Sequence, residues 1–170
     1  MIEALAASGT DRKPQADDLR GRAFEAAPAS PGSVDGQPFE WIADADMRLG
    51  PVCEAMINGR YYWVPFNRLS QITIEAPTDL RDLVWTPVQF TFANGGETVG
   101  AIPTRYPGSE NADDPHLQLA RETSWIEDSP DIVTGLGQRV IATDSGEHPL
   151  MDVRAIDLAA ATEGPGEPGA

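Results

Sequence analysis

Short apolar runs separated by turn residues fill this sequence from Phe39 onward, and they restrict it to a fold built from β-hairpins. The clearest case is NGRYYWVPF at residues 58–66, where an Asn-Gly dipeptide stands between two apolar runs. Asn-Gly is the strongest short-range hairpin signal, because both central residues of its two-residue turn need a positive φ angle. The pattern therefore predicts antiparallel strands at residues 50–57 and 60–66, joined by this turn.

The same reasoning predicts two more hairpins and two single strands. The expected strands are at residues 39–43, 50–57, 60–66, 70–76, 87–93, 97–106, 138–144 and 150–156. The turn segments NGG and SGEHP join the last four of these strands into two hairpins. Each run is rich in β-branched or aromatic residues, which suit the surface of a sheet.

Three short helical segments complete the expected elements. Residues 14–28 carry apolar side chains at helical spacing, and a connector rich in Pro, Gly and Ser ends this helix. One or two helical turns are expected at 78–85, and a short helix is expected at 113–122. The predicted fold class is α+β: a bent antiparallel sheet or partly open barrel built from hairpins, with a few short helices.

The chain of 170 residues is long enough for one ordinary domain with its own core. We divide it into a remnant helix and connector at 1–32, a β-rich domain at 33–158 and a tail at 159–170. The tail consists almost entirely of small residues, Pro and Glu, a composition typical of disorder.

Net charge and cysteine content narrow the class of function. The formal net charge is -15, so the phosphates of nucleic acid and anionic membrane surfaces would be repelled. No apolar run approaches the roughly 20 residues that cross a bilayer. Cys53 is the single cysteine, so no internal disulfide forms and nothing indicates an oxidising compartment. We therefore expect a cytoplasmic protein that binds neither nucleic acid nor membrane.

The sequence offers few residues for catalysis or for holding a cofactor. His116 and His148 belong to no cluster with the spacing of metal ligands, so we expect no metal and no cofactor. The one acidic cluster of interest is Asp44 and Asp46 with Arg48, which would support a small hydrolase if these carboxylates lined a concave pocket. That hydrolase is kept as an alternative hypothesis; otherwise we expect neither catalytic residues nor a small-molecule substrate.

The aromatic strand at 60–66 is the best candidate for binding another protein. Alternate side chains of a strand point to opposite faces. Tyr61 and Trp63 share one face, which we expect in the core because large aromatic residues are usually buried. Tyr62 and Phe66 share the other face, which we expect to contact a partner or a covering helix.

Arginine and tyrosine are enriched at binding hot spots, so residues of these types near the aromatic strand extend the candidate surface. The candidate partner-binding residues are Arg60, Tyr62, Phe66, Arg105 and Tyr106.

Five segments are long enough to be specific: FEWIADADMRLGP, INGRYYWVPFNRL, DLRDLVWTPV, NGGETVGAIPTRYPGSE and GLGQRV. In this order they resemble sequence blocks of the ImpE family, accessory proteins of bacterial type VI secretion, and the resemblance covers residues 17–156. It implies a cytoplasmic adaptor without catalytic residues. It also implies two partners, the small subunit of the contractile sheath and the ClpV-type ATPase that disassembles contracted sheath.

The sequence departs from this family in one respect. Family members typically carry a helical N-terminal domain of about a hundred residues, a usual size for one domain. Here only its last helix is expected, at 14–28. A third hypothesis therefore remains, in which the chain is a structural remnant that lacks its partner-binding domain.

Overall fold

The structure is a computed structural model that describes residues 13–129 and 132–159. The expected disordered tail lies outside these residues, apart from its first residue. The helices are α2 (Lys13–Ala26) and α3 (Pro115–Gln118), with single 3-10 turns at η1 (Phe66–Arg68) and η2 (Ser109–Asn111). In this part of the chain, no helix is both long and apolar enough to cross a membrane.

Strands make up most of the remaining fold. They are β1 (Gly32–Val34), β2 (Gln37–Phe39), β3 (Ile42–Asp44), β4 (Val52–Ile57), β5 (Arg60–Pro65), β6 (Leu69–Ile74), β7 (Trp85–Phe92), β8 (Glu97–Pro103), β9 (Thr123–Ser129), β10 (Ile132–Gly137), β11 (Val140–Thr143), β12 (Gly146–Pro149) and β13 (Ala155–Leu158).

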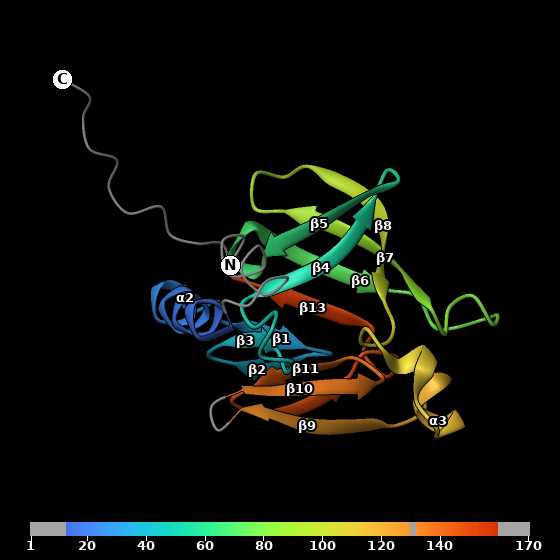
Figure 1. The fold of residues 1–170 in the computed structure, drawn as a ribbon. Coiled ribbons are helices and arrows are strands. Elements are labelled where there is room, and N and C mark those ends of the chain that lie inside the picture. The colour runs from blue at the N-terminus through green and yellow to red at the C-terminus, as the bar shows by residue number, and fades with distance from the viewer. Residues whose placement is uncertain (1–12, 130–131, 160–170) are drawn as a thin grey trace.

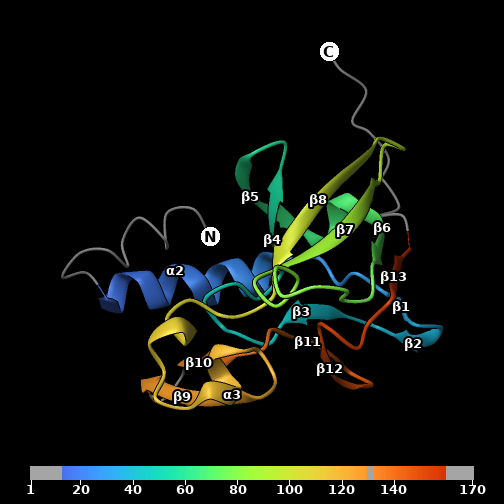
Figure 2. The same ribbon diagram turned by 90° about the vertical axis from the view of Figure 1, so that its right-hand side faces the viewer.

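The largest sheet has eight strands in the order β2-β1-β13-β6-β7-β8-β4-β5, and its neighbouring strands are antiparallel. β4 pairs with β8 through only two residue pairs, Met56 with Ala101 and Ile57 with Gly100. The two strands diverge beyond that point, so the β4–β5 hairpin folds over β6 and β7 (Figures 1 and 2). The fold is thus mostly antiparallel sheet with few helices, as expected, and β5 remains an edge because the sheet does not close into a barrel.

The hydrophobic core fills the concave side of this bent sheet. Its members include Val64, Phe66, Phe90, Ile102 and Ile156, each less than 10% exposed. They come from β5, η1, β7, β8 and β13, so strands distant in sequence share one core. Burial of apolar surface at about 25 cal/mol per Å² is the main force that holds the sheet in this shape.

A second part of the molecule lies below strands β4 to β8 in Figure 1. It contains the three-stranded sheet β12-β11-β3 and the separate β9–β10 hairpin. Helix α2 lies at the left of that view. Phe24 anchors this helix, since a Cβ on Gly50 would lie only 2.0 Å from the Phe24 ring. Gly50 also has a φ angle of +53°, a conformation that glycine adopts easily.

Two of the three predicted hairpins are confirmed. Asn58 and Gly59 have φ angles of 51° and 72°, and they join β4 to β5 as the Asn-Gly signal requires. β7 and β8 pair around residues 94–96. The predicted helices at 14–28 and 113–122 correspond to α2 and α3, and Asp114 caps α3 by accepting a hydrogen bond from the His116 amide.

Three expectations were wrong. β11 pairs with β12 and β3 rather than with residues 150–156, and β13 instead lies between β1 and β6. The expected strand at 39–43 is broken, because β2 ends at Phe39 and β3 begins in another sheet. Residues 80–84 form turns rather than a helix, and the Asp82 carboxylate accepts hydrogen bonds from the Thr78 and Asp79 amides.

Candidate partner-binding site

The aromatic strand β5 lies at one end of the eight-stranded sheet, but its two faces are the reverse of those expected. Val64 and Phe66 point into the core, with 8% and 1% exposure. Tyr61 is 49% exposed and Trp63 is half-buried, so neither is a core residue. The alternation of the strand was predicted correctly, but alternation does not tell which face meets the core.

The five candidate partner-binding residues do not form one surface. Arg60 is exposed and Tyr62 is 42% exposed, so both are accessible to a partner. Phe66 and Tyr106 are buried, at 1% and 0% exposure, and they are corrected to structural residues. Arg105 is half-buried and donates a hydrogen bond from Nη1 to the carbonyl of Gln118.

Tyr106 is buried because its hydroxyl takes part in a polar cluster below the sheet. The hydroxyl donates to Asp44 Oδ1 at 2.9 Å and accepts from the Val140 amide at 3.0 Å. The guanidinium carbon of Arg139 lies 5.1 Å from the centre of the Tyr106 ring, within the range of a cation–π contact. These contacts fix both ends of the tyrosine and join β3 to the start of β11.

Arg139 is the centre of this cluster and is only 1% exposed. Its Nη1 and Nη2 donate to Asp44 and Glu54, respectively, and its Nε donates to the Pro103 carbonyl at 2.8 Å. Burial disfavours the charged form, but the two carboxylates outweigh this effect and raise the pKa of Arg139. Burial also raises the pKa of Asp44, against the opposing effect of Arg139. The cluster is therefore an ion network that joins the two parts of the fold.

Asp46 is fully buried and joins the β9–β10 hairpin to the rest of the molecule. Its carboxylate accepts from the amides of Arg48 and Gly135, each at 2.8 Å, and forms an ion pair with the Arg48 guanidinium. Asp44 is 4% exposed and Asp46 is 0% exposed. This differs from the open acidic pocket that the hydrolase hypothesis requires. Among the described residues, no group of three or more His, Cys, Asp or Glu could hold a metal ion.

A short chain of hydrogen bonds leads from this network to the surface. Tyr61 donates from its hydroxyl to Glu54, and Trp63 donates from Nε1 to the Tyr61 hydroxyl at 2.6 Å. Partial burial and the adjacent Glu54 raise the pKa of Tyr61 to about 12, so its hydroxyl stays protonated near neutral pH. Glu54 in turn bonds Arg139. The indole of Trp63 is thus held in place through two intermediates by a buried arginine.

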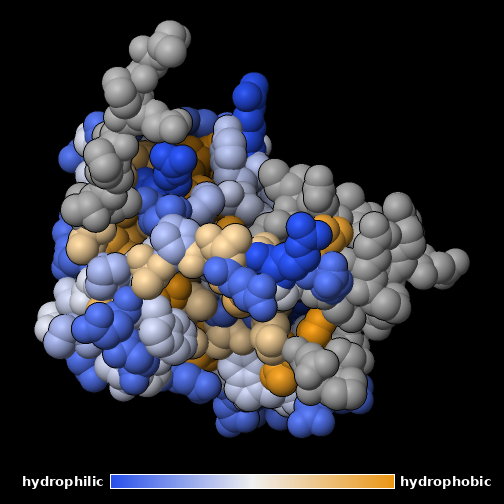
Figure 3. All heavy atoms as spheres, turned by 90° about the vertical axis from the view of Figure 1, so that its left-hand side faces the viewer, coloured by the Kyte–Doolittle hydropathy of each residue, from blue (hydrophilic) through white to orange (hydrophobic). Residues whose placement is uncertain are grey.

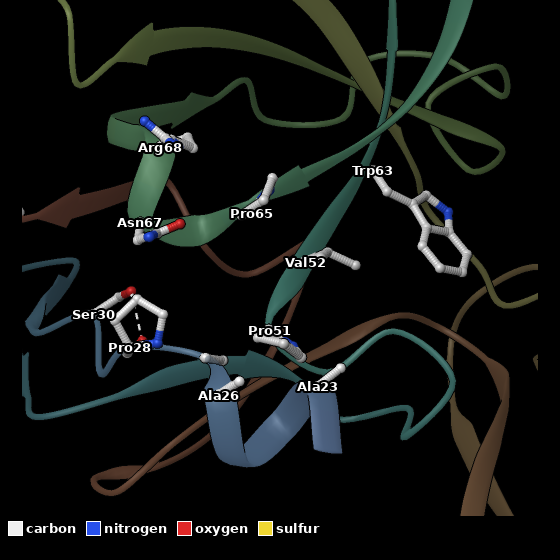
Figure 4. A pocket seen from close by; sticks show the side chains of 11 residues that line it. Ala23, Ala26, Pro28, Ser30, Pro51, Val52, Trp63, Pro65, Asn67 and Arg68 are labelled. Carbon is white, nitrogen blue, oxygen red and sulfur yellow. Dashed lines mark hydrogen bonds between the residues drawn. The ribbon is translucent and has the colours of Figure 1, made fainter. Parts of the chain in front are cut away.

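Trp63 stands between two hollows, which together we call the trough. The larger hollow has a volume of about 630 Å³ and lies between α2 and the β4–β5 hairpin (Figure 4). The smaller one, of about 230 Å³, lies on the Tyr61 side of Trp63. The larger is lined by Ala23, Ala26, Ala27, Pro28, Ser30, Pro51, Val52, Trp63, Pro65, Asn67 and Arg68. The smaller is lined by Arg20, Arg48, Leu49, Glu54, Tyr61, Trp63 and Pro107.

The trough suits binding better than catalysis. The lining of the larger hollow is mostly apolar, and its polar side chains are Ser30, Asn67, Arg68 and the Trp63 indole. Ser30 Oγ donates to the Pro28 carbonyl at 3.5 Å and has no histidine among the lining residues. On the face that carries α2, apolar residues lie among strongly hydrophilic ones (Figure 3). An apolar groove beside an edge strand can receive an extended peptide or a helix of another protein.

Comparison with known proteins identifies the family of this fold. The sequence profile described as "ImpE protein" matches residues 36–157. The chain belongs to the ImpE family. The resemblance found in the sequence is thereby confirmed, and the profile covers all strands from β2 to β12 together with most of β13.

Two individual proteins similar to this ImpE-family chain extend the comparison. The type VI secretion system accessory component TagJ of Pseudomonas aeruginosa is 45% identical over 158 residues, which are 93% of this chain and 55% of TagJ. A crystal structure of a Vibrio parahaemolyticus protein superposes with a TM-score of 0.78 at 26% identity, over 86% of this chain and 55% of that one. This chain thus spans about half the length of each.

Most of the trough was missed by reasoning from sequence. The alanines of α2 were recognised as one helical face, but nothing in the sequence placed them opposite Trp63 and Pro65. The available signals were the pair of apolar faces on β5 and Pro65, which lacks the N–H that a further strand would need. Pro65 marks an edge strand, and the two apolar faces indicate a strand that is covered on both sides. Neither signal reveals which distant element covers it.

Proposed function

We propose that this chain is a non-enzymatic cytoplasmic accessory protein of a type VI secretion system, and that it binds another component of that system at the trough. The observation that carries the proposal is the 45% identity to TagJ over 93% of the chain. The partners to be tested are the sheath small subunit and the ClpV-type ATPase, which membership in the ImpE family suggests.

The geometry of the polar residues supports an adaptor rather than an enzyme. Asp44, Asp46 and Glu54 are engaged with arginines, a tyrosine or backbone amides, so their carboxylates serve to hold elements together. The larger hollow of the trough offers an apolar surface to a partner, and no acid–base pair is found among its lining side chains. An adaptor needs a surface that fits its partner but no acid–base pair.

The trough also argues against a structural remnant without a partner. It is formed jointly by α2 and the ImpE domain, so the helix that precedes the matched region contributes to the surface. Trp63 is the one aromatic residue that lines both hollows. Half-buried tryptophans at the centre of a groove are frequent hot spots of binding.

The test is a calorimetric titration of this chain with the sheath small subunit and, separately, with the ATPase. We expect micromolar or tighter binding of at least one of them, roughly -8 kcal/mol or better. The Trp63→Ala variant should bind at least about tenfold more weakly, as expected of a hot-spot residue.

Trp41→Ala is the matched control, because Trp41 is 43% exposed on the connection between β2 and β3 and does not line the trough. It should bind as the unchanged chain does. If the folded chain binds neither component, or if both tryptophan variants lose affinity equally, the proposal is wrong.

A further inference from the structure

The outer edge of β5 carries backbone groups that no other strand of the described chain pairs. β5 pairs with β4 alone, and its register places Ile57 opposite Arg60 beside a two-residue turn. The residues that flank such a turn form a hydrogen-bonded pair, and bonded and non-bonded pairs alternate from there. The backbone groups of Tyr62 and Val64 therefore point toward β4. Those of Tyr61 and Trp63 point away from the sheet.

The trough lies along this same edge. Tyr61 and Trp63 line the smaller hollow, and Trp63 and Pro65 line the larger one. A strand added to β5 would direct every second side chain to the face that carries Trp63. Side chains four residues apart on that strand lie roughly 13 Å from each other, enough to pass on either side of the indole.

The charges at the trough are opposite in sign to the chain as a whole. Arg20 and Arg48 line the smaller hollow, where Arg48 is also paired with the buried Asp46, and Arg68 lines the larger hollow. The single carboxylate among the lining residues is Glu54, whose oxygens are held by Arg139 and Tyr61. The net charge of the whole chain is -15. A negative segment would thus be repelled by most of this protein and attracted at the trough.

We propose that the edge of β5 binds an extended segment of a partner protein as an added strand, with one apolar side chain in the larger hollow and one carboxylate at the arginines of the smaller hollow. Backbone hydrogen bonds to Tyr61 and Trp63 hold the segment, and the two side chains set its register. This deepens the proposed function by naming the form and chemistry of the bound element.

The net charge favours an extended segment of a partner over a second copy of this chain as the strand added to β5. Two copies that met edge to edge at β5 would each carry a net charge of -15, and their repulsion opposes such a dimer. An extended segment of a partner avoids this, because it brings few charges and places its carboxylate beside arginines.

The first experiment uses synthetic peptides of about nine residues, a length that covers one strand. Each has a leucine and a glutamate four residues apart in a threonine and serine background, and both orders are made because the strand direction is open. Lysine replaces glutamate in the control peptide. Titration into the whole chain should show binding of one glutamate peptide and at least about tenfold weaker binding of its lysine form.

Amide hydrogen exchange then tests the mode of binding. Tyr61 and Trp63 amides should exchange rapidly in the free chain and become protected by the bound peptide. Tyr62 and Val64 amides should already be protected, because they bond to β4. A segment that docks as a helix would leave the Tyr61 and Trp63 amides unprotected and would overturn the proposal.

Two variants of Tyr61 separate the contribution of its backbone N–H to peptide binding from that of its side chain. Tyr61→Ala removes the side chain alone, whereas Tyr61→Pro also removes the outward N–H, a change that an edge strand tolerates. Tyr61→Pro should bind the peptide at least about fivefold more weakly than Tyr61→Ala, since one charge-independent hydrogen bond is lost. Circular dichroism confirms that both variants keep the sheet.

Three results would overturn the inference: equal binding of glutamate and lysine peptides, equal binding by the two Tyr61 variants, or dimerisation of the free chain through β5 in sedimentation. None of them depends on a type VI component. Binding of the sheath subunit or the ATPase without protection of Tyr61 and Trp63 would preserve the proposed function and remove the added strand. If the chain binds the peptide but binds neither the sheath subunit nor the ATPase, the added strand is supported and the proposed function is wrong.

Discussion

Arg139 joins residues that are far apart in the sequence. Asp44 lies 95 positions away and Glu54 lies 85 positions away, yet each bonds one end of its guanidinium. Arginine suits this place because its planar fork donates in several fixed directions and stays charged when buried. Removing one member of such a network leaves the other charges buried without a partner, which is where most of the cost arises.

We therefore expect Arg139→Ala to lower the free energy of unfolding by about 3–5 kcal/mol. Urea denaturation followed by tryptophan fluorescence measures the change. Arg121→Ala is the control, because Arg121 is exposed, and it should change stability by less than about 0.5 kcal/mol. A similar loss in both variants would show that the buried network contributes nothing particular to stability.

The two faces of β5 lead to a second comparison of single residues. Phe66 is 1% exposed and belongs to the core, whereas Trp63 is half-buried beside the trough. Phe66→Ala should cost about 3–5 kcal/mol of folding stability, and Trp63→Ala should cost about 1–2 kcal/mol. Thermal melts of both variants check this order. The reverse order would restore the assignment of Trp63 to the core.

At single positions, the sequence predicted that a residue lies in a strand more reliably than it predicted which face of the strand is buried. Cys53 falls within the strand predicted at residues 50–57, and its side chain is buried. Tyr61 and Phe66 were assigned to the wrong faces, because strand alternation is the same whichever face is inside. The role of Arg139 was not predicted, because no local pattern links an arginine with carboxylates some ninety positions earlier.

Helix α2 contacts the loop before β4 through its Phe24 ring. Its Phe24 ring lies where a Cβ on Gly50 would stand, so ring and glycine fit together. Phe24→Ala should release α2 and open the larger hollow of the trough while the sheet persists. We expect at least about tenfold weaker binding of the partner, with less than about 2 kcal/mol lost in stability.

Gly50→Ala tests the same contact from the other side. The added methyl group would displace the Phe24 ring, and the φ angle of +53° adds strain. Both variants should therefore show the same loss of binding and increased protease cleavage within residues 13–26. Full binding by both variants would mean that α2 is not a wall of the functional site.

Asp144 connects the turn between β11 and β12 to the chain between β2 and β3. Its Oδ1 accepts from the Glu40 amide at 2.7 Å and from the Trp41 amide at 3.4 Å. These two hydrogen bonds hold the pKa of Asp144 below its ordinary value, and the bond from the Glu40 amide has the larger effect. Because the pKa of Asp144 is lower in the folded state, the ionised carboxylate stabilises the fold at pH values above its ordinary pKa of about 3.9. This stabilisation is lost as the pH falls through the lower pKa of the folded state.

Asp144→Ala should therefore be less stable than the unchanged chain near pH 6, and the difference should shrink toward zero as the pH falls through the lowered pKa of Asp144. Urea midpoints at several pH values measure it. A difference that stayed constant across this range would show that the side chain acts by packing rather than by its charge.

Local signals predicted the elements that are joined by tight turns. The Asn-Gly turn and the NGG segment each define a hairpin within a few residues, and β4–β5 and β7–β8 follow from them. β13 could not be placed in the same way, because its partners β1 and β6 are more than 80 positions away. The trough depends on such distant pairings, so it too was beyond prediction from sequence patterns.

The whole molecule consists of a bent sheet and a smaller second part, with an ion network at their junction. Cys53 lies on the inner face of β4 beside this junction and is 4% exposed. Burial raises the pKa of its thiol to about 12, so the thiol stays protonated at pH 8. The thiolate is the reactive form, and the core also blocks access to it.

Cys53 should therefore react with a thiol reagent at pH 8 only when the molecule opens, and at once in concentrated urea. If the bent sheet opens as one unit, Arg139→Ala should raise the labelling rate by about a hundredfold or more, in proportion to its loss of stability. If the β4–β5 edge opens separately, labelling will be faster than global unfolding allows and will not respond to Arg139→Ala. That result would mean that the network secures only the second part of the molecule, and that the edge on which the trough depends moves independently of it.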